Sequence, residues 1–218
     1  MSAQGPLRDG NASGFELIET LRWEPAIGFV RLDRHLARLA GSAHDLGFIC
    51  SISDARQALD RVAAGDAPMR MRLTLDAAGA LDVTAQAFSP LPADTLWKLG
   101  LADTTLDAAD PLLRHKTTRR QAYEAARAEF AREAADEVIL LNRNNEICEG
   151  TITTIFADFG DGRLLTPPLR CGLLAGVLRA ELLDEGKAAE AVLTINDIRT
   201  ASALFVGNSL RGLIKACL

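Results

Sequence analysis

Residues 69–94 read MRMRLTLDAAGALDVTAQAFSPLPAD, and this stretch decides how the chain is divided. Its first part alternates apolar and polar residues and the alternation restarts after Gly79, which is typical of a β-hairpin. Residues 89–94 then place two prolines with the spacing of an extended linker. We therefore expect a small α+β domain over residues 1–90 and a larger domain over residues 91–218.

On the N-terminal side of the hairpin, the pattern predicts two strands followed by two helices. The strands are expected at residues 15–22 and 28–32, with a turn at Pro25 between them. The first helix is expected over residues 33–47, because its apolar side chains recur every three to four positions and Gly47 can end it. The second helix is expected over residues 53–65.

On the C-terminal side of the linker, strands and helices alternate. An amphipathic helix is predicted directly after Lys116, and a second helix over residues 173–183. Strands are predicted at residues 96–102, 137–141, 152–156 and 203–206.

Composition excludes several classes of protein. The chain has 218 residues, of which 48% are hydrophobic, and a net charge of −5, so it can bury a core and offers no basic stripe for nucleic acid. Its four cysteines are widely separated and form no CxxC pair, which favours reduced thiols and no metal site. Residues 1–14 lack an apolar leader segment and no run of about 18 apolar residues occurs. We expect a cytoplasmic protein that does not bind membranes.

Lys116 stands out in 113-LRHKTTRRQAYEAARAEF-130 because it precedes a predicted helix. A helix N-terminus disfavours a positive charge, and three arginines lie nearby in the sequence. Both effects lower the pKa of an amine and favour its neutral, nucleophilic form, which Schiff-base chemistry requires. The alternative is a surface lysine in a solvated basic cluster.

Glu149 begins a predicted strand in 147-ICEGTITTIF-156 and is followed by a glycine. The glycine lets another group approach the backbone closely, so the acid is suited to hold a protonated ring nitrogen. It could equally be a solvent-facing glutamate at a strand end. Two glycine-containing segments, 172-GLLAGVLR-179 and 207-GNSLRG-212, are suited to bind an anion, or are an ordinary helix start and an ordinary tight loop.

Two arginines are further candidates. Arg38 is predicted on the polar side of the first helix, where an arginine is usually solvated or paired with an acid. Arg72 shares one strand face with Arg70 and Thr74, so it points either into a cleft or into water.

Taken in order, FELIETLR, RLDRHLARL, RHKTT, ICEGTITTIF, LLTPPL, GLLAGVLR and FVGNSLRG resemble the class IV pyridoxal-phosphate enzymes. This family includes branched-chain and D-amino-acid transaminases and 4-amino-4-deoxychorismate lyase. The resemblance implies an α+β fold in which a small α/β sandwich domain precedes a larger pseudo-barrel domain. Only 14 residues precede Phe15, so the fold is expected to be shortened at its N-terminus.

The resemblance also implies roles for individual residues. Lys116 is expected to form the Schiff base with pyridoxal 5'-phosphate and to act as the catalytic base, and Glu149 to face the pyridine nitrogen. The remaining expected positions are phosphate-binding and substrate-binding. They are Arg38, Gly176, Val177, Leu178, Asn208 and Ser209 for the phosphate, and Arg72 and Arg211 for a substrate carboxylate.

Within the family, FELIETLRWEP, RLDRHLARLA and FVGNSLRGL look most like the lyase. Transaminases often carry a tyrosine five positions after the lysine, where this chain has Gln121; its only tyrosine is Tyr123. The implied reaction is the release of pyruvate from 4-amino-4-deoxychorismate to give 4-aminobenzoate, a step of folate biosynthesis. The alternatives are a transaminase for D-amino or branched-chain amino acids, and a shortened protein that binds the cofactor without catalysis. The family implies a small-molecule substrate and a homodimer.

Overall fold

The computed structural model describes residues 14–218 and divides them into two compact units. One unit contains the described residues up to Ser89 together with His115–Arg119, and the other contains Pro90–Arg114 and Arg120–Leu218. Lys116 therefore belongs to the first unit, although it lies beyond the linker in sequence. Most of the N-terminal stretch in which we expect no leader, residues 1–13, lies outside the described residues.

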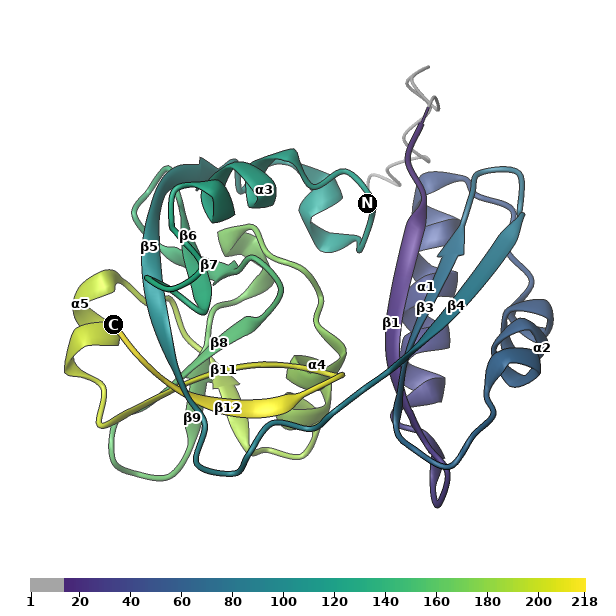
Figure 1. Cartoon of the computed structure of the whole chain (residues 1–218). Helices are drawn as coiled ribbons and strands as arrows, with labels where there is room; N and C mark the ends of the chain where they lie inside the picture. Colours follow the sequence, from purple (N-terminus) through teal and green to yellow (C-terminus); the bar gives the residue numbers. More distant parts are fainter. Residues whose placement is uncertain (1–13) are drawn as a thin grey trace. The chain divides into compact units, whose positions relative to one another are not determined.

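A four-stranded antiparallel sheet forms the first unit, with strand order β2-β1-β3-β4 (Figure 1). Strands β3 and β4 form the predicted hairpin, and Gly79 in its turn has a φ of 92°, which favours glycine. The elements are β1 (Leu17–Glu24), β2 (Gly28–Phe29), α1 (Leu32–Leu46), α2 (Ile52–Val62), β3 (Met69–Leu75) and β4 (Leu81–Ala87).

The two helices of the first unit pack on this sheet and close its core (Figure 1). Leu36 and Leu39 of α1 belong to the same buried cluster as Leu17 and Leu21 of β1. Successive side chains of a strand point to opposite faces, so Glu19, between these two leucines, lies on the same side as they do. A carboxylate is thus placed on an apolar face, and it requires a partner there.

The second unit is built on a curled eight-stranded sheet of order β10-β9-β8-β11-β12-β5-β6-β7 (Figure 1). Its strands are β5 (Leu96–Leu106), β6 (Glu137–Asn142), β7 (Ile147–Gly150), β8 (Thr154–Asp158), β9 (Leu164–Thr166), β10 (Ala188–Glu190), β11 (Ala203–Asn208) and β12 (Gly212–Cys217). Its α-helices are α3 (Gln121–Ala128), α4 (Val177–Asp184) and α5 (Ile195–Thr200), and its short 3-10 helices are η1 (Pro111–Arg114) and η2 (Leu169–Cys171).

Strand β6 is buried on both faces, which explains the apolar run over its residues 138–141. Ile139 packs into one hydrophobic cluster, whereas Val138 and Leu140 pack with α3 into another. Helix α4 contributes Leu178 to a further cluster around Phe156. None of the helices within residues 14–218 is long and apolar enough to cross a membrane.

The prediction that Lys116 heads a helix is wrong. Thr117 forms an antiparallel bridge with Leu17, which requires an extended backbone, and α3 begins only at Gln121. A helix dipole acts mainly within its first and last turns. The argument from a helix N-terminus therefore does not apply to Lys116.

Other predicted boundaries also differ from the structure: the helix predicted over residues 53–65 ends at Val62, and the strand predicted over residues 96–102 extends to Leu106. The predicted strand over residues 28–32 ends at Phe29, because Arg31 adopts a left-handed conformation (φ 60°) and α1 begins at the next residue. The helix predicted from residue 173 begins at Val177, because Gly172 has a φ of 87° and Gly176 is the N-cap.

Candidate active site

Lys116 is fixed by backbone pairing with the start of β1. The Ile18 N–H donates to the Lys116 carbonyl (2.8 Å), and the Thr118 N–H donates to the Glu16 carbonyl (2.9 Å). Alternation along this extended segment places the side chains of Lys116 and Thr118 on one side and that of buried Thr117 on the other. The sheet therefore determines the direction in which the lysine projects.

Arg38 has an acidic partner that the sequence did not indicate. Its Nε donates to Glu19 Oε1 (2.9 Å) and its Nη2 to Glu19 Oε2 (2.6 Å), and His35 Nδ1 lies 2.6 Å from Oε2. Burial of Glu19 opposes ionisation, but the charges and hydrogen bonds of Arg38 and His35 outweigh it and lower the pKa of Glu19 to about 2. Much of the positive charge of Arg38 is thus balanced within the first unit.

Arg31 is a candidate that the sequence analysis missed. It is the N-cap of α1 and adopts a left-handed conformation, with φ 60° and ψ 30°. Such a conformation is unfavourable for a residue with a side chain and is concentrated at ligand-binding positions. The turn at Arg31 contains no glycine, so the sequence did not predict a left-handed conformation there.

Arg72 lies in the middle of the first sheet. Its Cα is opposite Thr20 of β1 and Thr84 of β4, and its side chain is partly buried. This position is compatible with a polar site on one face of the sheet.

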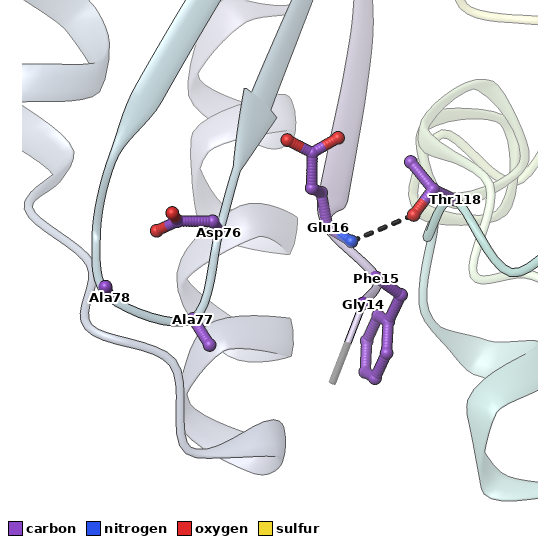
Figure 2. Close-up of a pocket in the computed structure, with 7 residues that line it drawn as sticks. All are labelled: Gly14, Phe15, Glu16, Asp76, Ala77, Ala78 and Thr118. Atoms are coloured by element: carbon purple, nitrogen blue, oxygen red, sulfur yellow. Dashed lines mark hydrogen bonds between the residues drawn. The ribbon is translucent and has the colours of Figure 1, made fainter. Parts of the chain in front are cut away.

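A hollow of about 480 Å³ lies at the start of β1 (Figure 2). Two acidic residues, Glu16 and Asp76, line the hollow together with Thr118. The Thr118 hydroxyl accepts a hydrogen bond from the Glu16 N–H (2.9 Å). Two carboxylates disfavour a phosphate. The hollow contains none of the predicted site residues, so it does not form the candidate site. Its lining consists of Gly14, Phe15, Glu16, Asp76, Ala77, Ala78 and Thr118.

In the second unit, Glu149 is a buried acid in β7 with a relative exposure of 5%. Its Oε1 accepts a hydrogen bond from the Tyr123 hydroxyl (2.6 Å) and another from the Leu174 N–H (3.1 Å). Burial, followed by the charge of Glu149, raises the pKa of Tyr123 well above its ordinary value. Tyr123 therefore stays protonated at neutral pH and acts as a donor, and the alternative of a solvent-facing Glu149 is wrong.

The residues after Glu149 are held by a second buried acid, Glu137. Its two oxygens accept from the Thr151 N–H (3.0 Å) and hydroxyl (2.6 Å), from the Ile152 N–H (3.1 Å) and from the Thr153 hydroxyl (2.8 Å). Gly150 lies against this group, because a Cβ there would approach Glu137 Cδ to 2.8 Å. The hydrogen bonds to Glu137 therefore fix the turn that ends β7.

The N-terminus of α4 lies beside this turn. Gly176 is its N-cap, and no side-chain hydrogen bond caps this helix within the described chain. A Cβ on Gly176 would lie 2.9 Å from Thr154 Oγ1, and Thr154 is opposite Gly207 in the sheet. A Cβ on Gly207 would approach Leu178 Cδ2 to 2.9 Å. Gly176–Leu178 and the segment preceding Asn208 are thus brought together.

The carboxamide of Asn208 organises the turn between β11 and β12. Its Oδ1 accepts from the N–H groups of Leu210 (3.1 Å) and Arg211 (3.0 Å), and its Nδ2 donates to the Ile152 carbonyl (3.1 Å). Ser209 in this turn is buried. The Arg211 guanidinium lies 5.9 Å from the centre of the Trp97 ring.

These groups provide the kinds of contact that a cofactor with an aldehyde, a basic ring nitrogen and a phosphate requires. A lysine is fixed in direction, a buried carboxylate is oriented by two donors, and a helix N-terminus is closely bordered by glycines. Within residues 14–218, no three His, Cys, Asp or Glu side chains gather as metal ligands would.

Comparisons with known proteins point to one family. Residues 16–217 match the family model described as Amino-transferase class IV. A Schizosaccharomyces pombe protein provisionally named aminodeoxychorismate lyase is 30% identical over 198 residues, which are 86% of this chain and 83% of that protein.

Two solved structures are similar over most of the chain. One, from Mesorhizobium loti and provisionally named an amino-acid aminotransferase, is 57% identical with a TM-score of 0.92 and covers 94% of this chain and 100% of its own. Another, 4-amino-4-deoxychorismate lyase from Pseudomonas aeruginosa, is 27% identical with a TM-score of 0.77 and covers 99% of this chain and 87% of its own. The predicted fold and family resemblance are confirmed.

Proposed function

This chain belongs to the Amino-transferase class IV family, and we propose that it is a pyridoxal-phosphate-dependent 4-amino-4-deoxychorismate lyase. The reaction releases pyruvate and leaves 4-aminobenzoate, a precursor of folate. The lyase is supported by the S. pombe protein and the P. aeruginosa structure, and by Gln121 at the position where transaminases of the family often carry a tyrosine. The observation that carries pyridoxal-phosphate chemistry of either kind is the buried, doubly hydrogen-bonded carboxylate of Glu149, and the choice of the lyase rests on the relatives and on Gln121.

Lys116 is proposed to carry the covalent and proton-transfer chemistry. When bound, pyridoxal phosphate supplies an electron-poor ring that stabilises negative charge developing on a substrate carbon. The Lys116 amine would hold the cofactor through its aldehyde and, once displaced by the substrate amine, would take a proton from the substrate carbon next to that amino group. Its backbone pairing with β1 limits the directions from which the amine can reach that carbon.

Glu149 is proposed to face the pyridine nitrogen as a carboxylate. A negative charge at this point keeps the nitrogen protonated. The Tyr123 and Leu174 donors orient the carboxylate without neutralising it, since both are uncharged.

The phosphate is proposed to bind at the N-terminus of α4, through the backbone of Gly176, Val177 and Leu178, with help from the turn containing Asn208 and Ser209. Free N–H groups and the helix dipole favour an anion there. Arg31 and Arg38 are the candidate positive charges from the first unit. We favour Arg31 because its left-handed backbone is of the kind concentrated at ligand-binding positions, and the ion pair with Glu19 gives Arg38 a structural role.

Arg72 and Arg211 are proposed to bind the substrate carboxylates. Guanidinium groups bind carboxylates with paired hydrogen bonds, and the lyase substrate carries more than one carboxylate. We also propose that the protein acts on its small-molecule substrate as a cytoplasmic homodimer, by analogy with its family. Sedimentation of the purified protein at micromolar concentration tests the dimer directly.

A second candidate function is amino-acid transamination. The M. loti structure, at 57% identity, carries an aminotransferase name and favours this alternative. Both reactions need Lys116 to remove a proton from the carbon next to the amine. They differ in the next step: the lyase expels pyruvate, whereas in the aminotransferase the proton returns to a different carbon and water then releases a keto acid.

Product analysis separates the two candidates. The cofactor-loaded protein is incubated with 4-amino-4-deoxychorismate, and separately with D-alanine or branched-chain amino acids plus 2-oxoglutarate. Pyruvate together with 4-aminobenzoate supports the lyase, and keto acid formation supports the aminotransferase. Lys116→Ala is the control, because it should abolish either activity and the visible absorption of the bound cofactor. Activity in neither assay would reject both candidates.

A further inference from the structure

The sequence contains a single tyrosine, and its hydroxyl contacts Glu149 directly. We propose that Tyr123 is a positioning residue that holds Glu149 as a hydrogen-bond acceptor towards the cofactor ring nitrogen. The inference rests on the proposed function, because it assumes that Glu149 serves that nitrogen. It goes beyond that function because it states that Tyr123, a residue of α3, sets the orientation of the Glu149 carboxylate.

The geometry at Glu149 supports a positioning role. The Tyr123 hydroxyl and the Leu174 N–H both donate to Oε1, from two different segments of the second unit. Two donors that converge on one oxygen fix the rotation of the carboxylate. Tyr123 supplies the shorter of these hydrogen bonds, at 2.6 Å against 3.1 Å.

Tyr123 is itself held in place by Arg120. The Arg120 guanidinium lies 4.9 Å from the centre of the tyrosine ring, and its Nη2 donates to the Thr151 carbonyl. The Thr151 hydroxyl in turn donates to Glu137. The hydroxyl that contacts Glu149 is therefore part of a connected group and not a mobile side chain.

The charges around Tyr123 keep its hydroxyl a donor. The titratable groups that face it are Glu149, Arg120 and the Cys148 thiol, and Glu146 and Cys171 lie next to Cys148. Burial and then the charge of Glu149 raise the pKa of Tyr123, and they outweigh Arg120, which lowers it. Burial raises the pKa of Cys148 as well, so this thiol stays neutral.

A hydrogen bond donated to a carboxylate favours its ionised form. With Tyr123 in place, Glu149 is a weaker competitor for the proton that the ring nitrogen must keep. Without the hydroxyl, Glu149 should take up a proton at a higher pH, and cofactor affinity should be lost there. A residue that only fills space would not produce this shift.

The first test measures the affinity of the apo-protein for pyridoxal phosphate from pH 4 to pH 8. Tyr123→Phe should weaken binding on the order of tenfold and move the acid limb of the profile to higher pH, because the Glu149 carboxylate loses a donor. In Glu149→Gln the contribution of this carboxylate to the acid limb should be missing, and adding Tyr123→Phe to it should change affinity less than about twofold. Thr104→Val, which removes another short hydroxyl contact with a carboxylate, that of Glu129, should bind as the wild type does.

The second test does not depend on a substitution at Tyr123. Growth on 3-fluorotyrosine labels this position alone, because the sequence has one tyrosine. The ¹⁹F resonance of the apo-protein should move as Glu149 titrates and move again on addition of pyridoxal phosphate. Glu149→Gln should remove the pH-dependent movement.

The outcomes separate this inference from the proposed function. Near-wild-type turnover in Glu149→Gln would reject the role of Glu149 at the ring nitrogen, whereas the proposed function itself fails only if product analysis shows neither activity. Impaired binding in Glu149→Gln combined with a normal profile in Tyr123→Phe would overturn only the role of Tyr123. The role of Tyr123 would also be overturned if Tyr123→Phe lowered cofactor affinity equally in the wild type and in Glu149→Gln. A ¹⁹F resonance whose pH dependence is unchanged in Glu149→Gln would overturn it as well.

Discussion

Arg38 of α1 and Glu19 of β1 form a two-point ion pair on the helix-facing side of the first sheet, with both side chains largely buried. Loss of one partner leaves the other charge buried and uncompensated. We expect Glu19→Gln to lower the free energy of unfolding by about 3 kcal/mol. Chemical denaturation at pH 7 measures this loss.

The same pair predicts an acid-sensitive stability. The pKa of Glu19 is about 2 in the folded protein against an ordinary value of 4.5, so the unfolded chain binds the proton first as the pH falls. The contribution of the pair is complete above about pH 4.5 and is lost between that pH and about pH 2. Across this window, the stability of Glu19→Gln should fall less steeply than that of the wild type.

The exposed pair of Asp33 and Arg56 provides the matched control. Its atoms are 3.9 Å apart and the side chains are 96% and 57% exposed. Asp33→Asn should change stability by less than about 1 kcal/mol, because solvent screens such pairs. An equal loss in both variants would mean that burial does not determine the strength of the Glu19 pair.

We expect Arg31 to bind the cofactor phosphate and Arg38 to stabilise the fold. Arg31→Gln should weaken pyridoxal phosphate binding by about tenfold, because a charged hydrogen bond to the phosphate is lost. Arg38→Gln should mainly reduce stability, since it leaves Glu19 buried without its partner. Fluorescence titration with the cofactor and denaturation of both variants measure the two effects. If Arg38→Gln were as stable as the wild type but bound the cofactor more weakly, Arg38 would be the phosphate-binding arginine.

The sequence predicted elements whose periodicity is local and sustained. Helix α1 and the β3–β4 hairpin were recognisable because their apolar side chains recur with the helix or strand period over most of the element. Strand β6 was recognisable by its continuous apolar run. Strands β9 and β10 have three residues each, too few to display a period of two. Strand β12 pairs in parallel with β5, more than a hundred residues earlier, and no local pattern encodes that partner.

The candidate site was predictable only in part for the same reason. The order of motifs pointed to Lys116 and Glu149 as residues, but not to their surroundings. The donors to Glu149 come from Tyr123 and Leu174, which are about 25 positions away on either side. The extended backbone at Lys116 results from pairing with β1, about a hundred positions earlier. Such contacts depend on the tertiary fold.

The four cysteines should differ in reactivity. All are free thiols, and Cys148 and Cys171 are fully buried. Burial, and then the charge of Glu146, raises the pKa of Cys171 to about 11, which leaves little reactive thiolate at pH 8. A thiol reagent added to the native protein should therefore modify Cys50 and Cys217 first. Mass spectrometry of digests identifies the sites, and early labelling of Cys148 would contradict the packing around Glu149.

Gly150 and Gly41 make a matched pair for testing the turn after Glu149. A Cβ on Gly150 would collide with Thr153 Oγ1 and lie 2.8 Å from Glu137 Cδ, whereas a Cβ on Gly41 in α1 meets no atom within 4 Å. Gly150→Ala should lower the free energy of unfolding by about 3 kcal/mol, because overpacking displaces the Glu137 hydrogen bonds. Gly41→Ala should raise it by about 0.5 to 1 kcal/mol, because alanine is the better helix former.

The cofactor affinity of the Gly150→Ala variant carries the prediction from stability to function. Glu149 directly precedes Gly150, so displacement of the turn should move the carboxylate away from the position that Tyr123 and Leu174 define. Pyridoxal phosphate should then bind more weakly to Gly150→Ala at temperatures where the variant is still folded, and normally to Gly41→Ala. If Gly150→Ala lost stability but kept wild-type affinity, the turn would support the fold without positioning Glu149.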